Sequence, residues 1–379
     1  MKVRENRAIT FLVITLLLID VMVLGSHVIM GHTLLDFSTY GDASEFLSLA
    51  DNFNSISPHF PGYGWLLFLV NIITFRFFEP AYLAVGINIV FQIMGGILAF
   101  WIAKLYDTDD HKALFIAVLI VIFPFQNLFL TLLPLSDSFK LFLSLAIFYC
   151  YKTRKEMLVI ILTAILVSTR NAFVLSAFGL SLLYLCERRY RLFFLSLMAY
   201  MPPIAFVLYR YVQVGDLFYY LNVDRYYMTV DGTPANIVRF PFYFIIQLLQ
   251  QSTVGLLSLL YQFPYLFLII IYGYRLLKKR DYFAIFFSGL LIIFLISSDA
   301  RFAYATISRY LAFCVPFIFP IYLDIFQKNF IFQNKYFRIL FSVYVLSLSF
   351  ATLVYSLMNF PESNLSDFIR NIKPKFLSL

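Results

Sequence analysis

Apolar segments long enough to cross a lipid bilayer recur along this chain from one end to the other. A transmembrane helix needs roughly 17–25 predominantly apolar residues, and inside lipid each backbone polar group must find its hydrogen-bond partner within the helix. The segments are apolar on all faces and lack the alternation of a membrane β-barrel strand. The sequence therefore predicts an all-α fold, a polytopic integral membrane helical bundle of about eleven spans. The predicted spans are 8–30, 62–78, 81–103, 113–132, 134–150, 157–185, 192–210, 256–274, 282–298, 309–326 and 339–358.

The composition excludes a soluble fold. Only 13% of the 379 residues are charged, while 61% are hydrophobic. A soluble domain carries about 25% charged residues, so this chain lacks the polar surface that such a domain needs. The sequence has no internal repeat, low-complexity tract or linker. We therefore predict a single membrane domain over residues 1–379.

The net charge of +8 is concentrated in short connections between the predicted spans. This distribution is typical of cytoplasmic connections under the positive-inside rule, rather than of a nucleic-acid-binding patch. The first apolar run is too long for a cleaved signal segment, so we expect an uncleaved first span with a cytoplasmic N-terminus. A cell inner membrane or an ER-type membrane is the expected location. One conflict remains, because the basic connection 152–155 falls on the outside by the count of spans.

Cysteine and histidine residues give no sign of a metal site. The chain has three cysteines and four histidines. Their spacing fits neither a disulfide framework nor a set of zinc ligands. We expect no metal and no cofactor.

The first loop, residues 31–61, is acidic. It contains Asp36, Asp42, Glu45 and Asp51 and no Lys or Arg, which favours an extracytoplasmic location. From Asp42 to about Asn54 apolar residues recur at helical spacing, which predicts an amphipathic helix along the membrane surface. Asp42 has two interpretations. With Glu45 it can form a capping box at the start of that helix, or it can serve as a functional acid.

Charged residues near the hydrocarbon are candidates for function, because each costs about 2.5–3.5 kcal/mol on insertion scales. Asp137 lies between two apolar runs, Arg170 interrupts the stretch 157–185, and Arg309 opens a late span. The stretch 157–185 fits one helix, or two short helices with Arg170 at the outer end. The structural alternative for each residue is a helix cap or an interfacial side chain. Asp20, inside the first span, is expected to face the bundle interior.

The segment 211–255 is polar at first and then amphipathic and aromatic. It predicts a second extracytoplasmic loop with a surface helix. Asp216 and Arg225 lie in this segment and are candidate ligands for a substrate.

Several short motifs follow one another along the chain: Gly41-Asp42-Ala43-Ser44-Glu45-Phe46-Leu47-Ser48-Leu49-Ala50, His59-Phe60-Pro61-Gly62-Tyr63, Ser136-Asp137, Ser168-Thr169-Arg170-Asn171, Gly215-Asp216-Leu217-Phe218-Tyr219 and Ser308-Arg309-Tyr310. Together they resemble the motifs of the GT-C superfamily of membrane glycosyltransferases. The motif that begins at Gly215 looks like an element of the members similar to GPI-anchor mannosyltransferases. The resemblance covers roughly residues 1–325.

The resemblance implies transfer of a sugar, such as mannose or another hexose, from a polyprenyl-phosphate-linked donor. The acceptor would be a lipid, a cell-envelope glycan or a protein on the extracytoplasmic face. Asp42 would act as general base, Arg170 and Arg309 would stabilise the phosphate, and no metal or nucleic acid would take part. Asp137 would orient an arginine or the acceptor. The other residues expected to bind substrate are Asp36, Glu45, His59, Asp216, Arg225 and Tyr310.

Two other classes remain open. An enzyme similar to O-antigen polymerases would also act on lipid-linked sugars, but would place its large polar loop late in the chain. A secondary transporter or flippase of lipid-linked sugars would have inverted repeats and helices broken near the midplane. The acidic loop after the first span favours the transferase.

Overall fold

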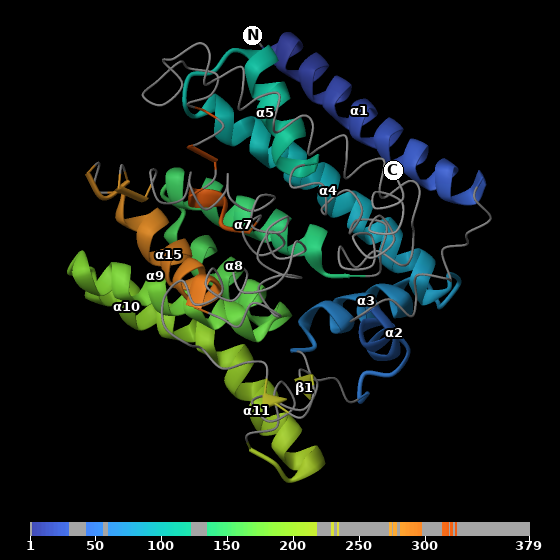
Figure 1. The fold of residues 1–379 in the computed structure, drawn as a ribbon, viewed down its shortest axis with the longest axis vertical. Helices are drawn as coiled ribbons and strands as arrows, with labels where there is room; N and C mark the ends of the chain where they lie inside the picture. Colours follow the sequence, from blue (N-terminus) through green and yellow to red (C-terminus); the bar gives the residue numbers. More distant parts are fainter. Residues whose placement is uncertain are drawn as a thin grey trace, which may run out of the picture.

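The computed structural model describes residues 2–29, 43–55, 60–122, 135–217, 229–230, 233–234, 273–274, 276–278, 281–297, 313–317, 319–320 and 323. Within these residues the fold is helical, as the sequence predicts (Figure 1). The exception is a small antiparallel ladder between β1 (Thr229–Val230) and β2 (Thr233–Pro234).

The helical elements are α1 (Lys2–Ile29), α2 (Ala43–Asp51), α3 (Gly62–Ile73), α4 (Pro80–Lys104), α5 (Asp110–Ile122), α7 (Asp137–Lys152), α8 (Glu156–Thr169), η2 (Asn171–Phe173), α9 (Val174–Cys186), α10 (Tyr190–Ser196), η3 (Leu197–Tyr200), α11 (Met201–Val214) and α15 (Tyr282–Ser297).

Helix lengths fall into two groups. Among the described residues, three helical stretches are long and apolar enough to cross a membrane: Glu5–Gly25 in α1, Pro80–Lys104, and Tyr190–Val214, which joins α10 to α11. The helices α7 and α8 have 16 and 14 residues, and α3 has 12. At 1.5 Å per residue these shorter helices measure about 18–24 Å, less than the hydrocarbon thickness of about 30 Å.

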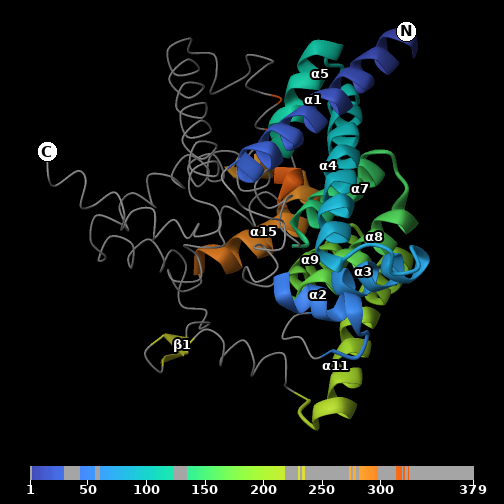
Figure 2. The ribbon, with the colours of Figure 1, turned by 90° about the vertical axis from the view of Figure 1, so that its right-hand side faces the viewer.

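Helix α1 runs antiparallel to α4, and both views of the ribbon show the two together (Figures 1 and 2). Leu16, in the middle of α1, packs on Gly96 of α4, where an added Cβ would lie 2.9 Å from a Leu16 methyl carbon. Further along, Asp20 is 1% exposed. With the Gln92 amide nitrogen turned toward it, the Asp20 carboxylate accepts hydrogen bonds of 2.8 and 3.1 Å. The expectation that Asp20 faces the bundle interior is confirmed.

The connections between helices gather at two ends of the bundle. At one end Lys152, the last residue of α7, lies 3.5 Å from the Asp281 carboxylate and above the ring of Tyr106. At the same end Glu156, at the start of α8, accepts hydrogen bonds of 2.8 Å from Arg189 and from the Tyr184 hydroxyl. The connections α4–α5, α7–α8 and α9–α10 and the start of α15 therefore lie together. We call this the basic end.

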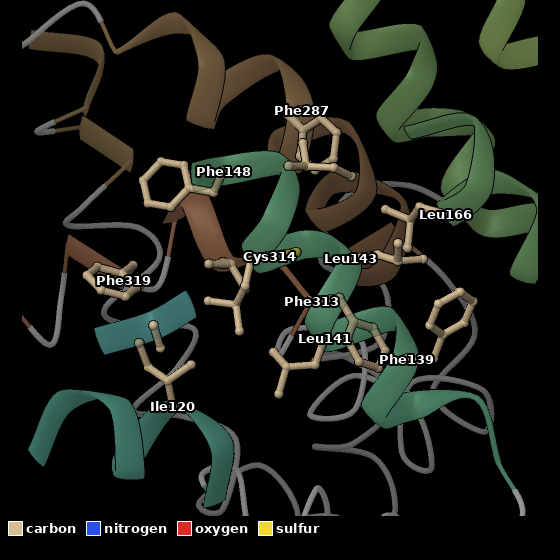
Figure 3. Close-up of a cluster of buried hydrophobic side chains, with 14 of the residues drawn as sticks. Ile120, Phe139, Leu141, Leu143, Phe148, Leu166, Phe287, Phe313, Cys314 and Phe319 are labelled. Carbon is tan, nitrogen blue, oxygen red and sulfur yellow. The ribbon is translucent and has the colours of Figure 1, made fainter. Parts of the chain in front are cut away.

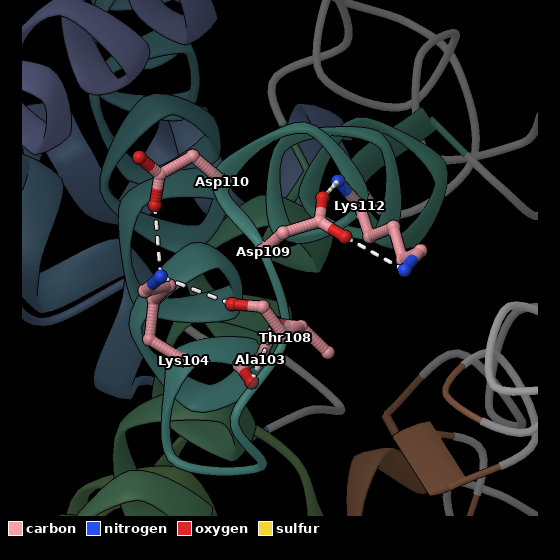
Figure 4. Close-up of polar contacts among 6 residues, drawn as sticks. All are labelled: Ala103, Lys104, Thr108, Asp109, Asp110 and Lys112. Atoms are coloured by element: carbon pink, nitrogen blue, oxygen red, sulfur yellow. Dashed lines mark hydrogen bonds and ion pairs between the residues drawn. The ribbon is translucent and has the colours of Figure 1, made fainter.

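The α4–α5 turn shows how a connection at the basic end is fixed (Figure 4). Lys104 donates to the Asp110 carboxylate at 2.8 Å and to the Thr108 carbonyl at 3.0 Å. Asp109 precedes α5 and accepts a 2.9 Å hydrogen bond from the backbone N–H of Lys112, as a helix-capping side chain does. The Lys112 ammonium lies 2.7 Å from the same carboxylate. These hydrogen bonds lower the pKa of Asp109.

Helix α7 lies at the centre of the hydrophobic core (Figure 3). Phe148 packs between two late segments of the chain, with its ring 6.0 Å from Phe319 and 6.3 Å from Phe283 of α15. Phe139 and Phe313 occupy the other end of the same cluster. Since most of α7 is buried, Asp137 and Lys140 in its first turn are buried with it.

The stretch 157–185 is two helices, one of the two arrangements that the sequence allows, because Arg170 takes an extended conformation (φ −164°, ψ 137°) between α8 and α9. Two other predicted boundaries differ from the structure. The stretch 62–78 contains a helix that ends at Ile73, and positive φ angles at Phe75 and Arg76 follow it. Helix α11 continues to Val214, past the predicted loop boundary at 211. The predicted span 339–358 and most of 256–274 lie outside the described residues.

Candidate functional site

Helix α2, in the described part of the acidic first loop, packs against α3 to form a helical hairpin. Helix α2 begins at Ala43, one residue after Asp42, and buries Ala43, Phe46 and Leu49 against α3. The rings of Phe46 and Tyr63 meet edge-on, with centroids 5.3 Å apart. A Cβ on Gly64 would lie only 2.6 Å from the Cβ of Leu49, so this close approach requires glycine. The predicted amphipathic helix is confirmed, and it ends at Asp51.

The first turn of α3 packs against the end of α8. A Cβ on Gly62 would lie 2.8 Å from the carbonyl carbon of Ser168 and would also clash with the Ser168 hydroxyl. Gly62 belongs to the turn that opens α3, and Ser168 lies two residues before Arg170. Two motifs that are separated by about a hundred positions in the sequence are therefore in direct contact.

The next residue of α3 connects the hairpin to the start of α7. The Tyr63 hydroxyl donates a 2.8 Å hydrogen bond to Oδ1 of Asn88 in α4. The amide nitrogen of Asn88 donates in turn to the Leu135 carbonyl at 2.9 Å, just before α7. The Tyr63 ring also lies 6.2 Å from the ring of Phe139. Gly62 and Tyr63 thus sit between the end of α8 and the beginning of α7.

A buried ion pair occupies the first turn of α7. The Lys140 ammonium lies 3.5 Å from the Asp137 carboxylate, and both side chains are only 1% exposed. The ammonium also lies 5.2 Å from the centre of the Phe313 ring. That ring is 5.8 Å from Phe173, which follows Arg170 in the α8–α9 turn. A second route of contacts therefore joins the start of α7 to the Arg170 region.

The structure brings together several of the residues predicted from the sequence. Glu45 is partly buried on α2, while Asp137 and Arg170 are buried beside the first turn of α3. Asp216 follows the end of α11, and in both ribbon views that end of α11 projects away from α7 (Figures 1 and 2). The structure therefore does not bring Asp216 to the start of α7. The predicted residues outside the described part of the chain are Asp36, Asp42, His59, Arg225, Arg309 and Tyr310.

Two buried cations were not among the residues predicted from the sequence. Lys140 and Arg210 are 0% and 1% exposed, although each lies in or next to an apolar run. Arg210 donates to the Gln213 side-chain oxygen at 2.8 Å, and Gln213 donates to the Tyr209 hydroxyl at 3.0 Å. Tyr209 donates in turn to Asn54 of the first loop at 2.6 Å. A charge inside an apolar run is the signal that would have identified both residues.

Aromatic rings attach the hairpin to α11. Phe53 stacks on Trp65 with ring centroids 4.4 Å apart, and Trp65 meets Phe206 of α11 edge-on at 4.8 Å. The indole N–H of Trp65 donates to the Phe53 carbonyl at 3.3 Å. These contacts fix the hairpin between α4 on one side and α11 on the other.

The chemistry of this region suits an anion better than a metal ion. Within the described ranges, no group of three or more His, Cys, Asp or Glu residues could hold a metal. The buried Lys140 instead lies in the first turn of α7, whose N-terminal N–H groups and dipole favour negative charge, and the buried Arg170 lies in the α8–α9 turn.

Comparison of the chain with protein-family models, with curated proteins and with solved structures finds no match. A functional proposal therefore depends on the residues and the geometry described above.

Proposed function

We propose that this protein is an integral membrane glycosyltransferase of the GT-C type, which transfers a sugar from a polyprenyl-phosphate-linked donor. The acceptor is a hydroxyl group of a lipid, a glycan or a protein on the extracytoplasmic face. One observation carries the proposal: elements bearing motifs far apart in the sequence touch one another. Gly62 contacts Ser168, Tyr63 contacts Phe139, and Lys140 lies above Phe313, shortly after the Ser308-Arg309-Tyr310 motif.

Surface composition supports placement in a membrane. Large apolar side chains point outward along α1, among them Phe11 at 59% exposure and Met22 at 72%. An exposed apolar surface of this kind is expected where a helix faces lipid or a partner. The basic end, with Lys152 and the Arg188-Arg189 pair, is then cytoplasmic by the positive-inside rule.

Helix lengths support a site in the outer half of the bilayer. Asp137 and Lys152 are the first and last residues of α7, so they lie about 22 Å apart along the axis. Arg170 lies a similar distance from Glu156, about 21 Å along α8. Measured from the cytoplasmic side of a hydrocarbon core about 30 Å thick, both charges are about two thirds of the way across. Charged residues at such depth are functional candidates by default.

A revised topology removes the conflict at 152–155. Helix α3 ends at Ile73, and the chain turns at Phe75 and Arg76, so in this topology the α2–α3 hairpin stays on the outer side. Helix α8 runs from the cytoplasmic end toward the outer side, and α9 runs back to the cytoplasmic end. In this topology the stretch 62–78 no longer counts as a span, and the stretch 157–185 counts as two. The number of helical passes stays at about eleven. The connection 152–155 then lies in the cytoplasm, as its basic residues predict.

The proposed reaction is a displacement at the anomeric carbon of the donor sugar. Asp42 takes the proton of the acceptor hydroxyl, whose oxygen forms a bond to the anomeric carbon with inversion. The bond from that carbon to the phosphate oxygen breaks, and polyprenyl phosphate leaves with the electron pair. Arg170 and Arg309 offset the charge that develops on the phosphate, and Asp137 orients an arginine or the acceptor. Asp36, Glu45, His59, Asp216, Arg225 and Tyr310 are the further residues proposed to bind donor or acceptor.

The direct test is transfer from a defined donor. Purified protein in liposomes receives radiolabelled sugars on polyprenyl phosphate, with extracted membrane lipids and glycans as acceptors. We expect label in a new product together with free polyprenyl phosphate. Movement of intact donor across the bilayer without product would instead identify a flippase. Elongation of a lipid-linked glycan by whole repeat units would identify a polymerase.

A further inference from the structure

A buried hydroxyl without a partner marks the start of α7. Ser136 occupies the N-cap position, where a serine side chain ordinarily accepts a hydrogen bond from the first turn. Here the side chain makes no capping hydrogen bond and is 0% exposed. Its Oγ has no hydrogen-bond partner among the residues that the structure describes. Because an unsatisfied buried polar group is unfavourable, the hydroxyl points to a ligand.

The charges around this hydroxyl favour an anion. The first N–H groups of any α-helix lack a partner inside the helix and carry partial positive charge. Lys140 adds a full positive charge one turn inside α7, a position where the helix dipole disfavours a cation. Asp137 balances that one charge from 3.5 Å away. An anion bound before Asp137 would complement the dipole and the Lys140 ammonium together.

A second buried cation, Arg170, lies in the α8–α9 turn, which is linked to the start of α7 through α3. Arg170 is 6% exposed and lies two residues after Ser168, which contacts Gly62. Tyr63, next to Gly62, packs on Phe139 in the first turn of α7. The α8–α9 turn and the start of α7 are therefore both neighbours of the first turn of α3. Arg170 thus lies in a turn that contacts the same part of α3 as the start of α7.

We propose that the start of α7 is the binding site for the phosphate group of a polyprenyl phosphate. The Ser136 hydroxyl and the first backbone N–H groups of α7 donate hydrogen bonds to the phosphate oxygens, and Lys140 supplies the nearest full charge. The identity of the lipid rests on the proposed function, whereas the phosphate chemistry follows from the site. A helix that begins inside the membrane with its N-terminus toward an anionic group is an established way of holding such a group.

The site also fits the charge change during transfer. In the donor the phosphate is a diester with one negative charge. When the bond to the sugar breaks, the leaving monoester gains a second negative charge. Fixed donors at Ser136 and the helix N-terminus would therefore stabilise the leaving group more strongly than the bound donor.

The test measures ligand binding to the full chain in detergent micelles, with native mass spectrometry as the readout. The ligands are a short-chain polyprenyl monophosphate, the matching polyprenol and inorganic phosphate. Wild-type protein is expected to bind the monophosphate at least about tenfold more tightly than the alcohol. Ser136→Ala is expected to weaken monophosphate binding by about tenfold and to leave polyprenol binding unchanged.

Helix α7 provides a matched control. Ser144 lies two turns further along, and among the described residues its buried hydroxyl also lacks a partner. Ser144→Ala should therefore bind the monophosphate as the wild type does. Removal of Lys140 alone would take a compensating charge away from the buried Asp137 carboxylate and would destabilise the fold. The double variant Asp137→Asn with Lys140→Gln keeps the interior neutral and is expected to lose at least about tenfold in affinity.

Each outcome decides the proposal. Equal monophosphate affinity in wild type and Ser136→Ala overturns it, as does equal loss in Ser136→Ala and Ser144→Ala. Inorganic phosphate that binds as tightly as the lipid would assign the site to free phosphate and overturn the lipid. An unchanged rate of sugar transfer in the Ser136→Ala variant would overturn this inference and leave the proposed function standing. Binding that depends on Ser136, without transfer of any sugar, would do the reverse.

Discussion

The Tyr63 hydroxyl donates a 2.8 Å hydrogen bond to the Asn88 side chain, and both residues are buried. The Asn88 amide nitrogen donates a second hydrogen bond to the Leu135 carbonyl, 47 positions away in sequence. A single amide therefore relates the first-loop hairpin to the start of α7. The position of Asp137, two residues after Leu135, depends on this relationship.

Removal of that amide should destabilise the protein. Asn88→Ala leaves the Tyr63 hydroxyl and the Leu135 carbonyl buried without partners, and we expect a loss of about 2–4 kcal/mol in unfolding free energy. Tyr63→Phe removes one hydroxyl and should cost about 1–3 kcal/mol. Thermal or denaturant unfolding in detergent gives the values. Strictly additive losses in the double variant would contradict the coupling, because residues in contact show non-additive effects.

The contact between Gly62 and Ser168 should tolerate no side chain. Gly62→Ala forces a methyl group into the end of α8, and we expect a loss of about 1–3 kcal/mol in unfolding free energy. Gly86→Ala in α4 is the control, because nothing lies within 4 Å of its added Cβ. That substitution should be neutral or stabilise by up to about 1 kcal/mol, since alanine favours the helix. Equal behaviour of the two variants would disprove the close approach.

Phe77 decides whether α3 crosses the membrane. It is 82% exposed and lies between α3 and α4. In the proposed topology a cysteine at Phe77 reacts with an impermeant maleimide from outside, as a cysteine at Ser55 does. A cysteine at Lys155 reacts only after permeabilisation. The background has Cys150, Cys186 and Cys314 replaced. Protection of the Phe77 site until permeabilisation would show that 62–78 crosses and would restore the conflict at 152–155.

Asp42→Asn separates a helix cap from a general base. Asparagine caps a helix about as well as aspartate, so folding should be unaffected. The asparagine amide cannot take up the proton of the acceptor hydroxyl, so we expect sugar transfer to fall by about 10²–10⁴-fold if Asp42 is the general base. Asp51→Asn, at the exposed end of α2, is the matched loss of one carboxylate and should retain transfer. Near-normal transfer by Asp42→Asn would make Asp42 a cap.

Asp109 should give the α4–α5 turn a pH dependence. Its folded-state pKa is lowered by the Lys112 hydrogen bonds, so the carboxylate stabilises the fold above its ordinary pKa. That contribution is lost as the pH falls through the lowered value. Asp109→Ala should cost about 1 kcal/mol at neutral pH, whereas Asp109→Asn keeps most of the cap. Unfolding followed from pH 7 downward should show the wild type converging on the alanine variant in acid.

The sequence allowed prediction of most helices, because apolar runs of sufficient length have one solution in lipid. It also predicted α2 from helical spacing and the inward position of Asp20. The end of α3 could not be predicted in this way, because Phe75, Phe77 and Phe78 extend the apolar run although the chain has already turned. The positive φ angles at Phe75 and Arg76 end the helix there, and hydropathy carries no record of them.

The site was predictable in part. Asp137 and Arg170 stood out as charges between apolar runs, and Arg170 indeed divides two helices. Asn88 and Ser136 did not stand out, because one amide or hydroxyl in an apolar segment is common. Their roles depend on neighbours that only the folded chain brings together, such as Leu135 for Asn88.

The pair α8 and α9 places a condition on biogenesis. Two segments of 14 and 13 residues with an arginine between them are poor substrates for release into lipid one at a time. They are expected to leave the translocon as one unit. Gly179 of α9 then meets the backbone of Phe286 in α15, a helix synthesised almost a hundred residues later. The packing of α9 is therefore completed only when the ribosome has delivered α15, and a truncated nascent chain would expose this pair to membrane quality control.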